Sequence, residues 1–214
     1  MSVAVKICGL TTEAAVTAAV DGGAAYLGFV FYPPSPRAVS RQQAAKLCAP
    51  VPAEVTRVGL FVDADDHTIT AALDLVPLDM LQFHGHESPQ RVAEAKARFQ
   101  CKVIKALAIA GHDDIAAASD YEDVADLLLF DAQPPNRPAS LPGGNGLAFD
   151  WRLIAGHSWQ CPWMLSGGLT AELLPEAVRI SSAAMVDVSS GVEIRPGEKD
   201  PDKIRAFLAA AHAL

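Results

Sequence analysis

The stretch ADLLLFD, residues 125–131, places a continuous apolar run directly before the carboxylate of Asp131. Such runs are typical of strands that are buried on both faces, as in a parallel sheet covered by helices. Seven more short β-rich runs occur along the chain, at residues 3–8, 25–31, 56–62, 79–84, 102–107, 163–168 and 185–190. The chain therefore has eight candidate strands.

Stretches with helical spacing separate these runs. Residues 11–23 combine a Thr cap, Ala/Val periodicity and a Gly-Gly stop, and residues 88–99 begin with a Ser cap and a proline at the first helical position. Residues 40–50, 170–180 and 200–214 follow similar rules.

Eight strands, each followed by a helical stretch, fit a minimal α/β barrel in a chain of 214 residues. We therefore predict a (β/α)₈ TIM barrel that forms a single domain over residues 1–214. The alternative is a doubly wound open sheet. Such a sheet usually has fewer strands, and no GxGxxG motif follows the first run here.

The composition argues against several classes of function. The formal net charge is −8 and the pI is about 5.1, so a nucleic-acid partner is not expected. The longest apolar runs fall well short of the roughly 20 residues of a membrane span. The four cysteines stand far apart without a CxxC motif or a His pair at ligand spacing, which disfavours a metal site and a disulfide frame. We expect a soluble, cytoplasmic protein without a membrane partner, either a monomer or a homodimer.

In a barrel, functional residues lie at the carboxyl ends of the strands. Cys8 ends the first run just before a helix start, whose dipole would lower the pKa of the thiol. The alternative is a cysteine that packs as a small apolar side chain. Asp131 ends its run at a position where a carboxylate is costly unless it lies at the rim or takes part in chemistry.

Three further polar side chains and one arginine are candidates for binding. Gln82 and His84 alternate along one strand, so both are expected to face the barrel interior near its top. Asp187 on the last strand is a candidate inward-facing acceptor or a buried, capped carboxylate. Arg37 follows the prolines of YPPSPR, where it is either a fork for a carboxylate or phosphate or a solvated side chain.

Small-residue turns predict a phosphate site. SGG and SSG follow the last two strands, which is the usual phosphate position in this architecture. A third turn, GGNG, lies in the long loop 132–146, which is expected to act as a lid or binding loop and to lead into a helix. The candidate phosphate ligands are Gly143, Gly144, Gly146, Gly167, Gly168, Ser189, Ser190 and Gly191.

Taken together, these segments resemble the phosphoribosylanthranilate isomerases. The matching segments, in the order of the family, are KICGLT, LGFVFYPPSPR, VGLFV, LQFHG, LLFDA, GGNGLAFDW, LSGGL and DVSSGVE followed by PGEKD. The chain departs from the family pattern at Asp63, where Asn is frequent, at Phe83, where an aliphatic residue is frequent, and at Asn145, where Thr is frequent.

The resemblance implies an Amadori rearrangement of N-(5-phosphoribosyl)anthranilate that needs no metal and no cofactor. It also implies that Cys8 is the general base and Asp131 the general acid. Arg37 would hold the anthranilate carboxylate, Asp187 would line the sugar site, and the three small-residue turns would surround the phosphate of the substrate.

Three other functions compete with this one. Another phosphosugar isomerase or synthase barrel would typically rely on Lys, Glu or His at strand ends, but neither Lys6 nor Lys105 stands at the last position of its strand. An inactive barrel that only binds a phosphorylated ligand would not need Cys8 and Asp131 on separate strand ends. A purely structural or interaction protein is disfavoured because the chain shows no heptads or repeats.

Overall fold

The computed structural model describes residues 3–133 and 141–214. Eight strands form a closed parallel barrel in chain order, and the last strand pairs with the first. The strands are β1 (Ala4–Cys8), β2 (Tyr26–Val30), β3 (Thr56–Phe61), β4 (Met80–Phe83), β5 (Lys102–Ile109), β6 (Leu127–Ala132), β7 (Trp163–Leu165) and β8 (Met185–Val188). The predicted barrel is confirmed, and the open sheet is excluded by the closure.

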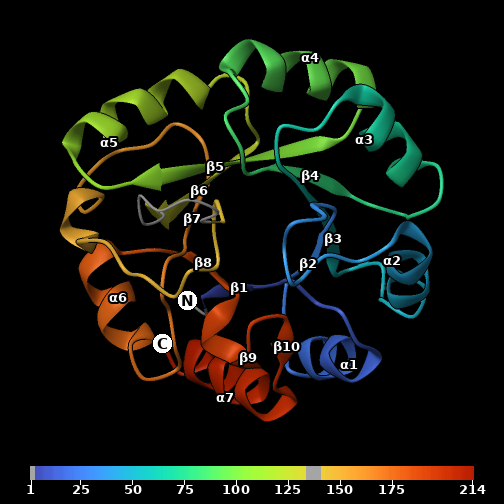
Figure 1. Ribbon diagram of the computed structural model, residues 1–214. Helices are drawn as coiled ribbons and strands as arrows, with labels where there is room; N and C mark the ends of the chain where they lie inside the picture. The colour runs from blue at the N-terminus through green and yellow to red at the C-terminus, as the bar shows by residue number, and fades with distance from the viewer. Residues whose placement is uncertain (1–2, 134–140) are drawn as a thin grey trace.

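Seven α-helices in the described part of the chain surround the barrel (Figure 1). They are α1 (Glu13–Asp21), α2 (Arg41–Cys48), α3 (Asp66–Leu73), α4 (Pro89–Phe99), α5 (His112–Ala118), α6 (Leu174–Ser181) and α7 (Pro201–His212). Side chains at the starts of α1, α2 and α4 accept hydrogen bonds from backbone amides, as the sequence predicted for Thr and Ser caps.

The connection from β6 to β7 differs from the prediction. Within the described residues it holds only the 3₁₀ helix η2 (Trp151–Leu153), so the expected helix behind GGNG is wrong. Gly144 and Gly146 have φ values of 72° and 69°, and the backbone stays irregular from there up to η2. Part of the expected lid loop, residues 134–140, lies outside the described residues.

A short hairpin that the sequence did not predict follows β8. The 3₁₀ helix η3 (Ser190–Val192) leads into β9 (Glu193–Arg195), which pairs with β10 (Glu198–Lys199) before α7 begins. Gly197 makes the turn with a φ of 86°. The hairpin places Glu193 and Lys199 next to the end of β8, near the predicted site.

The core has two layers. The larger apolar layer lies between the barrel and the helices and includes Leu128 and Phe130 of β6. The smaller layer fills the barrel and consists of Val58, Met80, Ile104, Ala106, Leu127, Leu129 and Met164. Because side chains alternate along a strand, Asp131 continues the inward row of Leu127 and Leu129 and ends up at the mouth of the barrel.

Candidate active site

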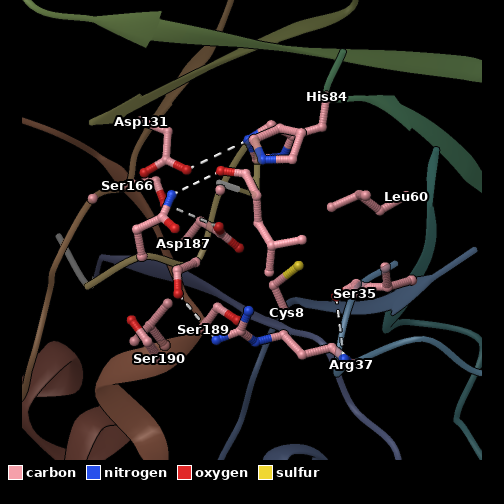
Figure 2. A pocket seen from close by; sticks show the side chains of 18 of the residues that line it. Cys8, Ser35, Arg37, Leu60, His84, Asp131, Ser166, Asp187, Ser189 and Ser190 are labelled. Atoms are coloured by element: carbon pink, nitrogen blue, oxygen red, sulfur yellow. Dashed lines mark hydrogen bonds and ion pairs between the residues drawn. The ribbon is translucent and has the colours of Figure 1, made fainter. Parts of the chain in front are cut away.

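A pocket with an empty volume of about 660 Å³ opens at the carboxyl ends of the strands. Figure 2 shows Cys8, Arg37, His84 and Asp131 around it, contributed by four different strands or the loops that follow them. Apart from Gln82, all the residues predicted for the site line this pocket.

Cys8 ends β1 and is 5% exposed. It packs against the apolar side chains of Val30 and Leu60, on one wall of the pocket. Burial raises the pKa of the thiol above its ordinary value, and the Lys6 ammonium opposes this only in part. The prediction that a helix lowers this pKa is therefore wrong.

Several backbone amides that follow Cys8 have partners other than the thiol. Thr12 caps α1, and its hydroxyl accepts a hydrogen bond from the backbone amide of Ala15 at 3.3 Å. The amides of Gly9 and Leu10 both donate to the carbonyl of Gly28, at 2.9 and 3.0 Å. Desolvation by the apolar wall is therefore the dominant effect on Cys8.

Lys6 and Asp187 form a buried ion pair directly beside Cys8. The Lys6 Nζ lies 2.8 Å from Asp187 Oδ1, and Ser166 Oγ donates to Asp187 Oδ2 at 3.1 Å. Burial alone would lower the pKa of Lys6, but the charges of Asp187 and Cys8 outweigh burial and raise it. Lys6 was missed in the sequence because it stands inside its strand, although its alternation with Cys8 puts both on the same face.

Asp131 and His84 form the opposite part of the pocket. The distance between His84 Nε2 and Asp131 Oδ2 is 3.4 Å, and the second oxygen of Asp131 accepts the backbone amide of Ala132 at 2.9 Å. Gln82 lies fully buried behind the imidazole, with its Nε2 3.1 Å from His84 Nδ1. Gln82 therefore contacts the histidine and not the pocket.

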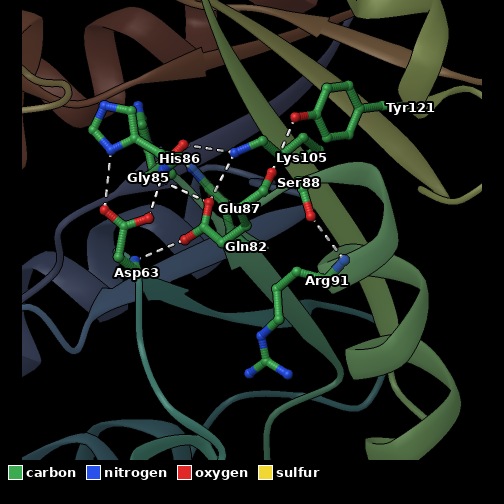
Figure 3. A network of polar contacts seen from close by, with 10 residues as sticks. Asp63, Gln82, Gly85, His86, Glu87, Ser88, Arg91, Lys105 and Tyr121 are labelled. Carbon is green, nitrogen blue, oxygen red and sulfur yellow. Dashed lines mark hydrogen bonds and ion pairs between the residues drawn. The ribbon is translucent and has the colours of Figure 1, made fainter.

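The turn after His84 is held by the polar network of Figure 3. Glu87 accepts the amide of Gly85 at 2.9 Å and the amide of Asp63 at 2.8 Å. Lys105 donates to the carbonyl of Gly85 and to Glu87, both at 2.8 Å. Both the amide and the carbonyl of Gly85 are thus hydrogen-bonded, which fixes the backbone next to His84.

Two of the departures from the family pattern fit this geometry. Asp63 has a φ of 47°, a left-handed conformation that Asn and Asp tolerate better than most residues. Phe83 is fully buried in the layer between barrel and helices, on the face that points away from the pocket.

Arg37 is 4% exposed, so it is not a solvated arginine. Its Nε and Nη2 donate to the two carboxylate oxygens of Glu193 at 2.8 and 2.9 Å, and Nη2 also donates to the carbonyl of Gly144 at 3.1 Å. One edge of the guanidinium is therefore engaged by the protein. Glu193 was not among the predicted site residues, because the hairpin that carries it was not predicted.

The glycine turns come together over the pocket. A Cβ at Gly143 would lie 2.7 Å from the His84 ring and 2.8 Å from Asp131 Oδ2, so the backbone there passes directly against both groups. A Cβ at Gly146 would lie 3.6 Å from the Ser190 hydroxyl. The turn 143–146 and the turns after β7 and β8 thus border one cavity, as the sequence predicted.

Comparisons with known proteins agree with this geometry. The family model for N-(5'phosphoribosyl)anthranilate (PRA) isomerase matches residues 5–210. A protein of Paracoccus denitrificans named N-(5'-phosphoribosyl)anthranilate isomerase is 58% identical over 213 residues, which cover 100% of this chain and 99% of the relative. One from Paramagnetospirillum magneticum with the same name is 54% identical, over 99% of this chain and 98% of the relative.

Solved structures agree as well. The crystal structure of phosphoribosyl anthranilate isomerase from Thermotoga maritima matches with a TM-score of 0.88 and 35% identity, over 99% of this chain and 100% of that one. A structure of such an enzyme in complex with reduced 1-(o-carboxyphenylamino)-1-deoxyribulose 5-phosphate matches with a TM-score of 0.82 and 33% identity, over 99% and 100% of the two chains. The chain therefore belongs to the phosphoribosylanthranilate isomerase family.

Proposed function

We propose that Cys8 and Asp131 are the base and the acid of the isomerisation that this chain catalyses. The enzyme converts N-(5'-phosphoribosyl)anthranilate to 1-(2-carboxyphenylamino)-1-deoxyribulose 5-phosphate in tryptophan biosynthesis. The observation that carries the proposal is the pocket itself, because a thiol on β1 and a carboxylate on β6 both line it. The two groups can therefore act on different atoms of one bound sugar.

The reaction needs one proton donor and one proton acceptor. Asp131 gives a proton to the ring oxygen of the aminoaldose, the ring opens, and the nitrogen forms a Schiff base. The Cys8 thiolate then removes the hydrogen at C2′, and the electron pair moves to the imine nitrogen. The resulting enolamine becomes the ketose. Because the imine nitrogen accepts the electrons, this mechanism needs no metal ion and no cofactor.

The raised pKa of Cys8 makes the thiolate the minority form in the free enzyme at neutral pH. Lys6 is the main group that stabilises this form, since its ammonium lowers the pKa of the thiol, and Lys199 adds a smaller effect in the same direction. Its ion pair with Asp187 keeps the ammonium in place beside the thiol. Asp187 itself lines the pocket and has the oxygen atoms to accept hydroxyl protons from the sugar.

The remaining pocket residues supply binding. The turns at Gly143–Gly146, Gly167–Gly168 and Ser189–Gly191 surround the phosphate, and Arg37 holds the anthranilate carboxylate with Nη1, since its other two guanidinium nitrogens donate to Glu193 and Gly144. His84 contacts the substrate beside Asp131, and Gln82 orients the imidazole from behind. In Figure 2 Asp131 and Arg37 lie at opposite sides of the pocket.

The surroundings of the enzyme are also part of the proposal. Cys8, Cys48, Cys101 and Cys161 are free thiols, in keeping with a reducing cytoplasm. In the described part of the chain, every helix is too short or too polar to cross a membrane.

The test follows the fluorescence of the substrate as the enzyme consumes it. Cys8→Ser and Asp131→Asn should each reduce kcat by about 10²-fold or more, the usual worth of a general acid or base. Both variants should melt as the parent does, because each replacement keeps the size of the side chain. Near-full activity in folded Cys8→Ser would show that the thiol only packs, and turnover absent from the parent protein would refute the function itself.

A further inference from the structure

Three charged side chains meet beneath the rim of the pocket, and two of them come from the hairpin that follows β8. Arg37, Glu193 and Lys199 are 4%, 7% and 5% exposed. Burial of charges is costly unless each charge is paired and hydrogen-bonded. We call these three residues the charge cluster.

Glu193 lies at the centre of the charge cluster. It accepts two hydrogen bonds from Arg37, at 2.8 and 2.9 Å, and a third from Lys199 Nζ at 2.7 Å. Burial alone would raise the pKa of Glu193, but the two cations outweigh it and hold that pKa below its ordinary range. The carboxylate is therefore charged whenever the enzyme is active.

Each cation of the charge cluster also touches one predicted binding turn. Arg37 Nη2 donates to the carbonyl of Gly144 at 3.1 Å. Lys199 Nζ donates to the carbonyl of Ser189 at 2.9 Å and to its hydroxyl at 3.2 Å. Glu193 thus connects two proposed binding groups. One is Arg37, for the carboxylate of the substrate, and the other is the turn at Ser189, for its phosphate.

The charge cluster has an excess of one positive charge, since it contains two cations and one carboxylate. The neighbouring Lys6–Asp187 pair is neutral as a whole and does not compensate this excess. Burial lowers the pKa of Lys199, because removal from water disfavours the charged form of its ammonium. An anionic ligand in the pocket would offset the cost of this burial, and the substrate carries an anion at each end.

We propose that Glu193 is a specificity-determining positioning residue that sets the donors of Arg37 and Lys199 for the two anionic ends of the substrate. This inference rests on the proposed function. Nε and Nη2 of Arg37 donate to Glu193 and to the Gly144 carbonyl, so among the described contacts Nη1 is the donor left for the ligand, which limits the orientations open to the substrate carboxylate. Lys199 keeps Ser189 in place for the phosphate.

The alternative is that the charge cluster only stabilises the hairpin. The two roles differ in what they predict for small ligands that occupy one end of the pocket. Anthranilate presents only the carboxylate, and ribose 5-phosphate presents only the sugar phosphate. A positioning residue affects the inhibition constants of these ligands, whereas a merely structural residue affects the melting temperature alone.

The decisive variant is Glu193→Gln, which keeps the shape of the side chain and removes its charge. The matched control is Glu198→Gln, which removes an exposed carboxylate from the same hairpin, 46% exposed and paired with Arg195. In Glu193→Gln, KM and the inhibition constant of anthranilate should each rise roughly tenfold, the worth of one charge-assisted hydrogen bond. The change in kcat should stay within about threefold, because the interaction acts in the ground state as well.

A double-variant cycle identifies the route of the effect. If Glu193 acts on the carboxylate through Arg37, anthranilate should inhibit Glu193→Gln/Arg37→Ala no more weakly than it inhibits Arg37→Ala alone. Inhibition by ribose 5-phosphate should weaken in Glu193→Gln and in Lys199→Gln, and should not change in Glu198→Gln.

Unchanged KM and unchanged inhibition constants in folded Glu193→Gln would overturn the inference while leaving the proposed function intact. If that variant does not fold, Glu193→Asp is measured instead, because it keeps the charge but cannot reach both cations. It should weaken anthranilate inhibition. A folded Asp variant with parental constants, or failure of both variants to fold, would mean that Glu193 is only structural.

Discussion

The thiol of Cys8 packs against apolar side chains, and the proposed mechanism requires the same thiol to ionise and act as a base. Its apolar wall raises its pKa, and Lys6 lowers it in part. These opposing effects make the ionisation of Cys8 measurable by its chemistry, since only the thiolate reacts with alkylating reagents.

We expect alkylation of Cys8 by iodoacetamide to be slow at neutral pH. The rate should rise about tenfold per pH unit and keep rising beyond the range of an ordinary thiol, because the raised pKa delays ionisation. Limited access would slow the reaction equally at every pH. The pH at which the rate stops rising therefore reports the pKa of Cys8 alone. Mass spectrometry of the Cys8 peptide measures it, and a plateau below about pH 8 would contradict the assigned burial effect.

Arg37→Ala should raise KM more than it lowers kcat, since in the proposed mechanism the guanidinium binds substrate before and during the reaction. Arg37→Lys should restore the affinity only in part, because an ammonium cannot donate in parallel to both oxygens of the substrate carboxylate and to Glu193. Steady-state kinetics measures both effects. A parental KM in Arg37→Ala would remove this residue from the binding site.

Gln82 offers a test of how Asp131 is oriented. Donation from the Gln82 amide to His84 Nδ1 would require the imidazole proton to lie on Nε2, which faces Asp131. Gln82→Met should lower kcat by about three- to tenfold at an unchanged KM, because the imidazole loses its fixed tautomer. The ¹⁵N shifts of His84 report the tautomer directly, and an unchanged tautomer together with unchanged kcat would refute the role.

At the level of elements, the turn 143–146 borders the pocket with glycine backbone. Gly143→Ala would push a methyl group against His84 and Asp131, at distances of 2.7 and 2.8 Å before relaxation. We expect kcat/KM to fall by at least about tenfold, since a displacement near 1 Å is enough to disturb the reacting groups. Gly111→Ala is the matched control, because a Cβ there meets nothing within 4 Å and the backbone is extended. Equal activity of both variants would show that the turn can shift to accommodate the methyl group without disturbing the reacting groups.

The sequence predicted the elements whose signal is long and periodic. Apolar strands and capped helices carry such signals, which is why Cys8, Arg37 and Asp131 could be placed at strand ends from the order of residues alone. The hairpin β9–β10 has strands of three and two residues, too short for an alternation to show, so Glu193 and Lys199 were missed. The helix expected behind GGNG is wrong because it was inferred from the order of elements and not from a periodic signal of its own, and only the 3₁₀ helix η2 follows the turn in the described residues.

At the scale of the whole molecule, buried thiols make the free energy of unfolding depend on pH in the alkaline range. Burial raises the pKa of Cys48 from 9.0 to about 12. Between these two values the folded protein retains a proton that the unfolded chain has lost. The free energy of unfolding therefore falls as pH rises through this window, by up to about 1.4 kcal/mol per pH unit for such a group.

Cys48→Ala should remove this contribution. Between about pH 8 and about pH 11 its free energy of unfolding should fall by about 2 to 3 kcal/mol less than that of the parent. Urea titrations at the two pH values measure the difference. Leu47→Ala, a buried neighbour in the same helix, should be destabilised by the same amount at both pH values, and an identical pH slope in Cys48→Ala would disprove the effect.

The closure of the barrel between β1 and β8 also decides when the enzyme becomes active during its synthesis. Lys6 and Asp187 are 181 residues apart in sequence, and Lys199 and Glu193 lie later still. The nascent chain leaves the ribosome with Cys8 first, yet the partners of that region emerge last. Contacts of such high sequence separation form late, so a chain stalled before β8 contains the proposed base but lacks the closed barrel and the pocket in which that base would act.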